Sequence, residues 1–275
     1  MVVQHNLQAA NTNRQLGITT SAQAKSTEKL SSGYKINRAA DDAAGLSISE
    51  KMRSQIRGLN KASSNAQDGV SLVQTAEGAL NETHSILQRM NELATQAANG
   101  TNTSVDRSAI KAEIDQLTSE IDRIQSTTQF NTMNLLDGSF AGSTKMKLQV
   151  GALSGQMIDF SIANMAASKI GLSTNTLKVD NFTNAGICMK AVQDAIELVS
   201  KQRSAMGAIQ NRLEHTIANL DTTSENTQSA ESRIRDTDMA SEMVTYSKNN
   251  ILAQAGQSML AQANQSTQGV LSLLQ

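Results

Sequence analysis

The residues able to carry chemistry are few in this chain, and they lie far apart in the sequence. The three histidines, His5, His84 and His215, fall in three separate segments. A metal site or a general base with its orienting partner needs such groups to converge, and no spacing here brings them together. Cys188 is the single cysteine, so the chain can form neither an internal disulfide nor a cysteine-rich metal cage. We expect Cys188 to be a small buried hydrophobic residue rather than a nucleophile.

A carboxylate pair, Asp41 and Asp42, stands directly before a helical pattern that begins at Ala43. Aspartate in that place accepts hydrogen bonds from the first N–H groups of a helix, and we prefer this interpretation to a catalytic pair. The glycines show no phosphate-binding spacing. The sequence therefore predicts no enzymatic activity, no cofactor and no metal.

The composition favours long helices. The chain of 275 residues contains no proline, whereas ordinary proteins contain about 5%, and proline is the residue that helix interiors exclude. Aromatic residues are 2% of the chain, which is too few for a bulky globular core. The net charge of −1 provides no basic surface, so we expect no nucleic-acid partner.

Both ends of the chain are nearly free of charge. Residues 249–275 contain no charged side chain, and residues 1–13 contain only the titratable His5. Glutamine, serine and asparagine interrupt both ends, whereas a membrane span needs about 20 predominantly apolar residues, so we expect no membrane partner. Such ends suit burial against other protein, where an unpaired charge would be unfavourable. The N-terminus lacks a basic segment followed by an apolar run, which predicts no cleaved signal peptide.

Two series of mostly apolar residues repeat every seven positions, and such repeats predict long helices packed as a coiled coil. The first series is Met52, Leu59, Ala66, Val73, Leu80, Leu87 and Ala94, and the second is Val192, Val199, Met206, Leu213, Leu220, Thr227 and Ile234. The first helix should cover residues 43–98 and end near Asn99–Gly100, a C-cap pair. Thr103 and Asp106 fit a capping box for a further helix that turns back along the first.

The middle of the chain follows a different period. Apolar residues alternate at Met146, Leu148 and Val150, and again at Ile158, Phe160 and Ile162. This pattern predicts a β-hairpin whose loop spans residues 151–156. We expect helix to resume near Ala185 or Gly186. The predicted fold is mainly α: a long antiparallel helical coiled-coil rod with a small β-hairpin insert.

The two ends form weaker amphipathic stripes. They consist of Val3, Leu7, Ala10, Arg14 and Ile18 at one end, and Met239, Tyr246, Ala253, Leu260, Thr267 and Leu274 at the other. Isolated helices are marginal in water, and most helical stability comes from packing. We therefore expect the ends to pair with each other or with other copies.

Residues 31–60, SSGYKINRAADDAAGLSISEKMRSQIRGLN, resemble the N-terminal signature of bacterial flagellin. The resemblance continues at SLVQTAEGALNE, LQRMNELATQAANG, TTQFNTMNLL, GAIQNRLEHTIANL, AESRIRDTDMAS and the terminal VLSLLQ. It covers nearly the whole chain. Longer flagellins insert outer domains in the middle, so this chain resembles a minimal type that lacks the outer variable domains.

The resemblance implies three regions. Residues 1–42 and 236–275 would form the terminal coiled-coil domain, which lines the inner core of the filament and is disordered in the monomer. Residues 43–136 and 183–235 would form the helical rod, and residues 137–182 the β-hairpin insert of the rod. The residues expected in the terminal coiled coil, and therefore in assembly, are Val3, Leu7, Leu260, Val270, Leu271 and Leu274.

The resemblance also implies function, location and partners. The chain would be the structural subunit of the flagellar filament, exported unfolded by the flagellar type III apparatus and polymerised at the tip for swimming motility, and therefore extracellular. Its partners would be further copies in a helical homopolymer, an export chaperone on the C-terminal segment, and the filament cap and hook-junction proteins. As a monomer it would bind Toll-like receptor 5 through Gln88, Arg89, Leu93 and Glu113.

Two other interpretations are open. The hook–filament junction protein shares the terminal pattern, but the terminal VLSLLQ and the receptor motif favour flagellin. The cytoplasmic hairpin of a chemoreceptor is also an antiparallel coiled coil poor in proline, yet it signals rather than builds. The β insert between the two helical arms and the uncharged ends argue against a chemoreceptor.

Overall fold

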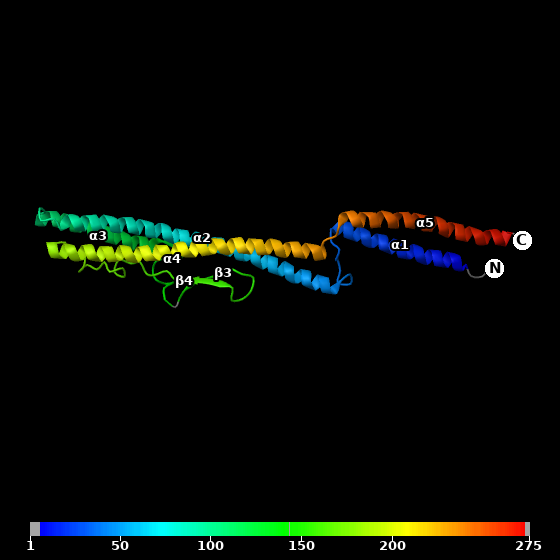
Figure 1. Cartoon of the computed structure of the whole chain (residues 1–275), viewed down its shortest axis with the longest axis horizontal. Helices are drawn as coiled ribbons and strands as arrows, with labels where there is room; N and C mark the ends of the chain where they lie inside the picture. Colours follow the sequence, from blue (N-terminus) through cyan, green and yellow to red (C-terminus); the bar gives the residue numbers. More distant parts are fainter. Residues whose placement is uncertain (1–5, 143, 273–275) are drawn as a thin grey trace. The chain divides into compact units, whose positions relative to one another are not determined.

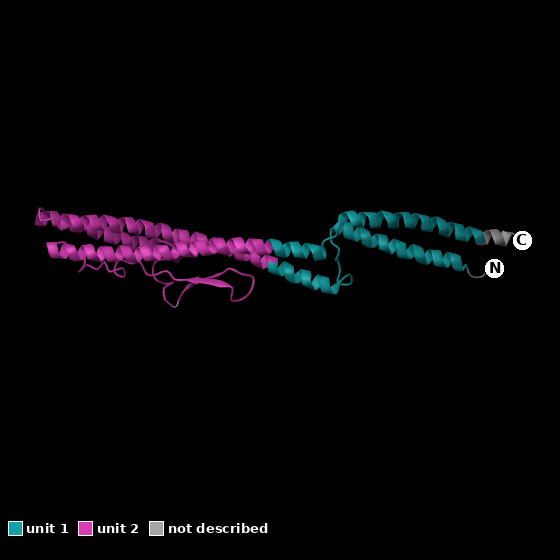
Figure 2. Ribbon diagram, in the orientation of Figure 1, with its two compact units in different colours: residues 1–55, 225–275 teal, residues 56–224 magenta. Residues whose placement is uncertain are grey.

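The computed structural model describes residues 6–142 and 144–272, with side chains up to residue 266. Its elements are α1 Leu7–Ser32, α2 Ala43–Ala97, α3 Ser104–Thr127, β1 Gln129–Phe130, β2 Met133–Asn134, β3 Met146–Gln149, β4 Met157–Phe160, α4 Phe182–Arg235 and α5 Met239–Ser272 (Figure 1). The chain divides into two compact units, residues 1–55 with 225–275 and residues 56–224 (Figure 2). The fold is mainly α with a small β insert, as the two sequence periods predicted.

The core of unit 56–224 lies among α2, α3 and α4. The α2 heptad residues from Leu59 to Ala94 are all buried, and so are the α4 heptad residues from Val192 to Leu220. Ile114 and Ile121 of α3 enter the same cluster and are at most 1% exposed. Each buried aliphatic side chain contributes about 1.5–3 kcal/mol relative to an exposed one. The seven-residue repeats therefore mark the seam on which this unit depends.

Polar pairs tie α2 to α4 and fix their antiparallel register. The Ser63 hydroxyl donates to an Asp221 carboxylate oxygen at 2.9 Å, and the Ser224 hydroxyl donates to Asn60 Oδ1 at 2.7 Å. Both serines are 8% exposed. Sliding one helix past the other by a turn would leave these buried groups without partners, which is unfavourable by about 1–3 kcal/mol for each group.

The predicted helix starts are confirmed. Asp42 Oδ1 accepts from the Gly45 N–H at 2.9 Å, which makes Asp42 the capping residue of α2. Thr103 and Asp106 form the reciprocal capping box of α3. The hydrogen bond from the Thr103 backbone is the main reason that the pKa of the Asp106 carboxyl lies below its usual value. Short polar residues that precede a helix thus direct where the long elements begin.

Helix α2 ends close to the predicted position, but a different residue caps it. The helix ends at Ala97, beside the expected Asn99–Gly100 pair, but Gly100 is not in the left-handed conformation that a C-cap glycine adopts. Arg107 of α3 takes that role instead. Its Nε donates to the Ala97 carbonyl at 3.1 Å and its Nη2 donates to the Asn99 carbonyl at 3.2 Å.

Helix α4 begins at Phe182, three residues before the predicted start at Ala185. The cause is Asn181, whose Oδ1 accepts from the Asn184 N–H at 2.8 Å. The Asn181 carbonyl also accepts from the Ala185 N–H at 2.9 Å. Asparagine is among the favoured N-cap residues, so this start was readable from the sequence.

Among the described residues, the strands form two antiparallel pairs. Strands β3 and β4 form the predicted hairpin, in the register Met146↔Phe160 and Leu148↔Ile158. The pair β1–β2 was not predicted. Its turn residues, Asn131 and Thr132, have φ of 48° and 64°, the double positive φ of a type I′ turn. The turn carries asparagine but no glycine, and threonine is an uncommon residue at positive φ, so the sequence signal was weak.

The loop that follows β3 lies against α2 at a glycine. A Cβ placed on Gly58 would lie 2.8 Å from the Cβ and 3.2 Å from the Cα of Ala152. The absence of a side chain at Gly58 therefore allows the loop to approach the helix backbone. Gly78, further along α2, has no such neighbour within 4 Å.

This contrast gives a testable expectation. Gly78→Ala should raise the free energy of unfolding by about 1 kcal/mol, the usual gain from replacing an exposed glycine inside a helix. Gly58→Ala should gain nothing or lower stability, because Ala152 must retract. Urea unfolding followed by circular dichroism measures both effects, and amide exchange at residues 146–160 should rise only in Gly58→Ala. An equal gain from the two substitutions would show that the loop is not seated on α2.

Helices α1 and α5 of the other unit pack antiparallel. The Asn6 amide donates to the Ala263 carbonyl at 3.1 Å, and Lys29 lies 3.7 Å from Glu242 at the opposite end of the pair. The seam residues that the pair covers repeat at heptad spacing. They are Thr12, Leu16, Thr19, Gln23, Ser26 and Leu30 on α1, and Glu242, Tyr246, Asn249, Ala253, Gly256, Leu260 and Ala263 on α5.

The predicted α5 heptad of Tyr246, Ala253 and Leu260 thus lies in the seam. The predicted α1 stripe does not, because Leu7 is 75% exposed and Ile18 is 58% exposed. The covered face of α1 is mostly polar, so the spacing of its apolar residues predicts the neighbouring face instead. Leu7 and Ile18 are therefore left available to other molecules.

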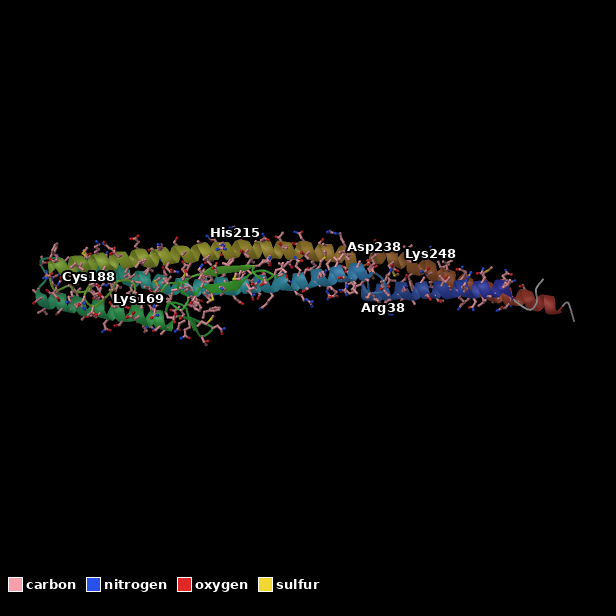
Figure 3. The ribbon with its side chains drawn as sticks, turned by 90° about the horizontal axis from the view of Figure 1, so that it is seen from below. Arg38, Lys169, Cys188, His215, Asp238 and Lys248 are labelled. Carbon is pink, nitrogen blue, oxygen red and sulfur yellow. The ribbon has the colours of Figure 1, made fainter. Side chains whose placement is uncertain are left out.

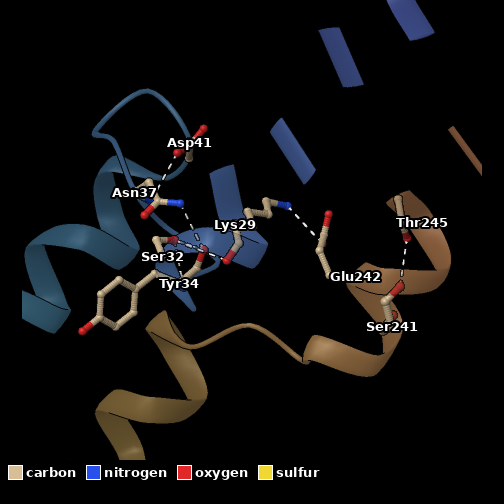
Figure 4. Close-up of polar contacts among 8 residues, drawn as sticks. All are labelled: Lys29, Ser32, Tyr34, Asn37, Asp41, Ser241, Glu242 and Thr245. Carbon is tan, nitrogen blue, oxygen red and sulfur yellow. Dashed lines mark hydrogen bonds and ion pairs between the residues drawn. The ribbon is translucent and has the colours of Figure 1, made fainter. Parts of the chain in front are cut away.

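The segments that join α1 to α2 and α4 to α5 are bonded to each other. Gly33 ends α1 in the left-handed conformation, with φ of 77°. The Lys35 N–H donates to the Arg235 carbonyl at 2.6 Å, and the Thr237 N–H donates to the Gly33 carbonyl at 3.0 Å. The Arg235 guanidinium lies 4.3 Å from the centre of the Tyr34 ring. Figure 4 shows Tyr34 among the polar contacts of this junction, with Lys29 directed toward Glu242.

Candidate functional site

The titratable residues considered first form no common site among the residues described. His84 lies on α2 and His5 lies outside the described residues. His215 lies on α4, where Figure 3 labels it. Within residues 6–142 and 144–272, no group of three or more His, Cys, Asp or Glu side chains could hold a metal ion. Cys188 on α4 is fully buried, and burial raises the pKa of its thiol to about 11. A thiol in that state is a poor nucleophile at neutral pH.

An apolar surface on α5 is the most unusual feature of unit 1–55 with 225–275. Val244 is 71% exposed, Ile251 67% and Met259 57%, and Met239, Met243 and Leu252 are about half exposed. We call these six residues the α5 apolar surface. They lie around the part of α5 that α1 leaves uncovered, and a large exposed apolar area of this kind marks an interaction site in soluble proteins.

A shallow groove of about 410 Å³ runs between α1 and α5 beside this surface. It is lined by Asn11, Thr12, Gln15, Leu16 and Thr19 of α1, and by Leu252, Ala255, Gly256 and Met259 of α5. None of these side chains is charged. A second apolar helix could enter the groove without burying an unpaired charge, which would be costly in a protein interior.

The predicted terminal residues divide between two environments. Leu260 is half-buried in the seam of α1 and α5, whereas Leu7 faces outward and is 75% exposed. Val270 and Leu271 belong to the α5 backbone, but their side chains are not described, and Val3 and Leu274 lie outside the described residues. Sequence reasoning missed Val244 and Ile251, although these two residues are also seven positions apart.

A second cluster joins α2 to α3. Arg89 of α2 donates from Nε and Nη2 to Glu113 Oε1 of α3, at 3.1 and 3.0 Å, and from Nη1 to Glu92 Oε2 at 3.2 Å. These bonds, that to Glu113 first, raise the pKa of the Arg89 guanidinium above its usual value. Gln88 is exposed beside Arg89, and its Nε2 lies 3.0 Å from His84 Nε2.

The cluster brings three of the four predicted receptor residues to one surface. Gln88, Arg89 and Glu113 are all exposed. Leu93 is 2% exposed and belongs to the core beneath them. Its side chain supports the packing of α2 against α3 rather than offering a contact surface.

No helix within the described part of the chain has a stretch long and apolar enough to cross a membrane. The exposed apolar residues of α5 alternate with polar ones such as Ser247 and Asn250. They are spread around the part of α5 that α1 leaves uncovered.

Comparison with known protein families gives two matches that together cover most of the chain. The bacterial flagellin N-terminal helical region matches residues 3–141, and the bacterial flagellin C-terminal helical region matches residues 189–274. The first match contains α1, α2 and α3, and the second contains most of α4 and all of the α5 residues up to 272. The α5 apolar surface and the Arg89 cluster therefore both fall within the matched regions.

Full-length relatives agree with these matches. The chain is 55% identical over 274 residues to a flagellin of Halalkalibacterium halodurans and 50% identical over 286 residues to a flagellar filament 31.3 kDa core protein of Treponema maltophilum, with all of each chain covered. Among solved structures, Bacillus cereus flagellin is similar with a TM-score of 0.50 and 31% identity, over 57% of this chain and 88% of that one. Matches of this extent leave no other assignment: the chain belongs to the bacterial flagellin family.

Proposed function

We propose that this chain is a structural subunit of the bacterial flagellar filament and polymerises with copies of itself. The observation that carries the proposal is the α5 apolar surface, which is exposed in the single chain and overlaps the charge-free residues 249–275. Relatives of full length named flagellin and flagellar filament core protein support the same function.

The physical argument concerns the area that a single chain leaves in water. Burying one large aliphatic side chain contributes about 1.5–3 kcal/mol, and the α5 apolar surface presents six large apolar residues, each about half exposed or more. Neighbouring copies can cover these residues. If the surface contacts a different surface on the next copy, and the rotation does not close a ring, the product is an open helical polymer.

Polymerisation of the purified chain tests the proposal. We expect the protein to be monomeric in dilute low-salt solution and to form long filaments when a strongly salting-out anion such as sulfate is added, because such salts favour apolar burial. Sedimentation measures the polymer fraction and electron microscopy shows its form. A chain that remains monomeric, or stops at a dimer, would overturn the proposal.

We further propose that the chain acts outside the cell, in the flagellum, where it contributes to swimming motility after export through the flagellar type III apparatus. Before assembly the α5 apolar surface needs protection from nonspecific association. An export chaperone that binds the C-terminal segment would supply it, and the filament cap and hook-junction proteins would guide the first and last contacts of the polymer. What supports these steps is family membership together with the exposed apolar residues of α5.

We also propose that the monomer binds Toll-like receptor 5 through the cluster of Gln88, Arg89 and Glu113. The support is the matched motif and the arrangement of these three exposed side chains on adjacent helices. Glu113 holds the guanidinium in one orientation, so less rotamer entropy is lost when a partner binds. Arginine is enriched among the residues that dominate binding energy at protein interfaces.

Arg89→Ala should weaken receptor binding by roughly thirtyfold, which corresponds to a hot-spot loss of about 2 kcal/mol. Surface plasmon resonance with the immobilised receptor ectodomain measures the effect. The matched control is Arg123→Ala, which removes an exposed arginine paired with Glu120 on α3 and should leave affinity unchanged. Equal losses in both variants, or a loss under twofold in Arg89→Ala, would remove the cluster from the interface.

A further inference from the structure

The chain contains a single Asn–Gly step, Asn99–Gly100, in the turn between α2 and α3. We propose that Asn99 is a modification site: its side-chain amide is lost spontaneously through a cyclic imide formed with the Gly100 nitrogen, and Arg107 promotes the reaction. The inference is independent of the function proposed above.

The nucleophile is the Gly100 backbone nitrogen, and it is accessible. Asn99 and Gly100 are both exposed and lie outside the helices. Among the backbone hydrogen bonds of the described residues, the Gly100 N–H has no acceptor. A Cβ on Gly100 would meet nothing within 4 Å, so the turn is open around the reacting atoms. Glycine also allows the backbone rotations that ring closure requires.

The turn activates this nitrogen through the peptide carbonyl to which it is bonded. The Asn99 carbonyl oxygen accepts from Arg107 Nη2 at 3.2 Å and from the Asn102 N–H at 3.3 Å. When the Gly100 N–H loses its proton, the negative charge spreads onto this same oxygen. A guanidinium and an N–H directed at that oxygen stabilise the anion, as donors in an oxyanion hole do.

The electrophile is also positioned. Asn99 Oδ1 accepts from the Thr101 N–H at 3.4 Å. This contact folds the side chain back over the following residues and places a donor on the oxygen that becomes negative when the nitrogen attacks Cγ. The nucleophile and the electrophile of the ring closure are therefore both polarised by groups of this turn.

The reaction is balanced without any redox partner. Hydroxide takes the proton of the Gly100 nitrogen, the nitrogen forms a bond to Asn99 Cγ, and the Cγ–Nδ2 bond breaks as Nδ2 takes a proton from water and leaves as ammonia. Water then opens the imide. Opening at Cγ gives aspartate, and opening at the Asn99 backbone carbonyl gives isoaspartate. The net change is one water consumed and one ammonia released, with one negative charge gained at neutral pH.

The test follows the full chain during incubation at mildly alkaline pH, using peptide mapping by mass spectrometry and labelling by an isoaspartate-specific methyltransferase. Asn99 should react roughly tenfold faster than Asn131 or Asn175, which are exposed residues followed by threonine, because their neighbour carries a branched side chain. Gly100→Ala should slow the reaction by roughly tenfold. Asn99→Gln should abolish the isoaspartate label at this site.

The role of Arg107 has its own comparison. Arg107→Gln should slow the reaction at Asn99 roughly threefold or more, whereas Arg123→Gln on the same helix should have no effect. The wild-type chain should also react more slowly in urea, which dissolves the turn. If Asn99 reacts no faster than Asn131 and Asn175, the modification site is wrong. If Arg107→Gln or unfolding leaves the rate unchanged or raises it, the activation by the turn is wrong.

Discussion

Ile251→Asp should abolish filament formation while leaving the single chain folded. Ile251 is 67% exposed on α5, so an aspartate there remains hydrated in the monomer and disturbs no packing. In a polymer that covers the α5 apolar surface, the same aspartate becomes an unpaired buried charge in every copy. The penalty for such a charge is several kcal/mol even after relaxation. Because each subunit carries the change, no part of the polymer escapes it.

Sedimentation and electron microscopy after addition of sulfate measure the loss, and circular dichroism should report an unchanged melting midpoint for the soluble variant. Ile251→Leu is the matched control, since it conserves volume and apolar character and should polymerise normally. If Ile251→Asp formed ordinary filaments, the α5 apolar surface would face solvent in the polymer. Assembly would then have to rest on another part of the chain.

Leu87→Ala should destabilise unit 56–224 by about 2–5 kcal/mol, the usual range for removing a leucine side chain from a packed core. Leu87 is fully buried at the seam of the three long helices. Its removal leaves a cavity that rigid helix backbones close only in part. Urea unfolding followed by circular dichroism measures the change in the free energy of unfolding.

Leu198→Ala provides the comparison within α4. Leu198 is 47% exposed, so its truncation removes less apolar contact and leaves no enclosed cavity. The destabilisation should be under about 1 kcal/mol, as expected for a substitution away from the core. Equal effects from the two leucines would contradict the assignment of Leu87 to the central seam.

The heptads predicted the long helices because each of those residues fills the same seam. From Leu59 to Ala94 on α2, and from Val192 to Leu220 on α4, the repeat and the burial coincide. The capping residues Asp42 and Thr103 were equally readable, since their side chains act within one turn of their own position. Helix capping and the seven-residue packing period were therefore sufficient to predict most of the fold.

Features that depend on contacts between distant parts of the chain could not be predicted from these local patterns. The seam of α1 contains Thr12, Thr19 and Ser26, and these polar residues are covered only because α5 packs against them. Gly100 was expected to cap α2, but Arg107 supplies donors from the next helix. The residue pattern of one helix does not show which distant segment of the chain will pack against it.

The candidate sites show the same division. Family resemblance indicated Arg89 and Glu113, and the structure adds that they are hydrogen-bonded to each other and that Leu93 lies beneath them. The α5 apolar surface became visible only when α1 covered the opposite face of α5. The sequence of α5 alone does not distinguish Val244 and Ile251 from the neighbouring residues that form the seam with α1.

The junction of Gly33 to Lys35 with Arg235 to Thr237 has a mechanical consequence. Two unbonded connectors would act as independent swivels, and each could rotate without loading the other. Here the two hydrogen bonds of the junction run in opposite directions between the connectors, so a twist of one stretches a bond to the other. Torque applied through α1 and α5 is therefore shared by both chain segments, and the junction resists torsion as a two-stranded ribbon.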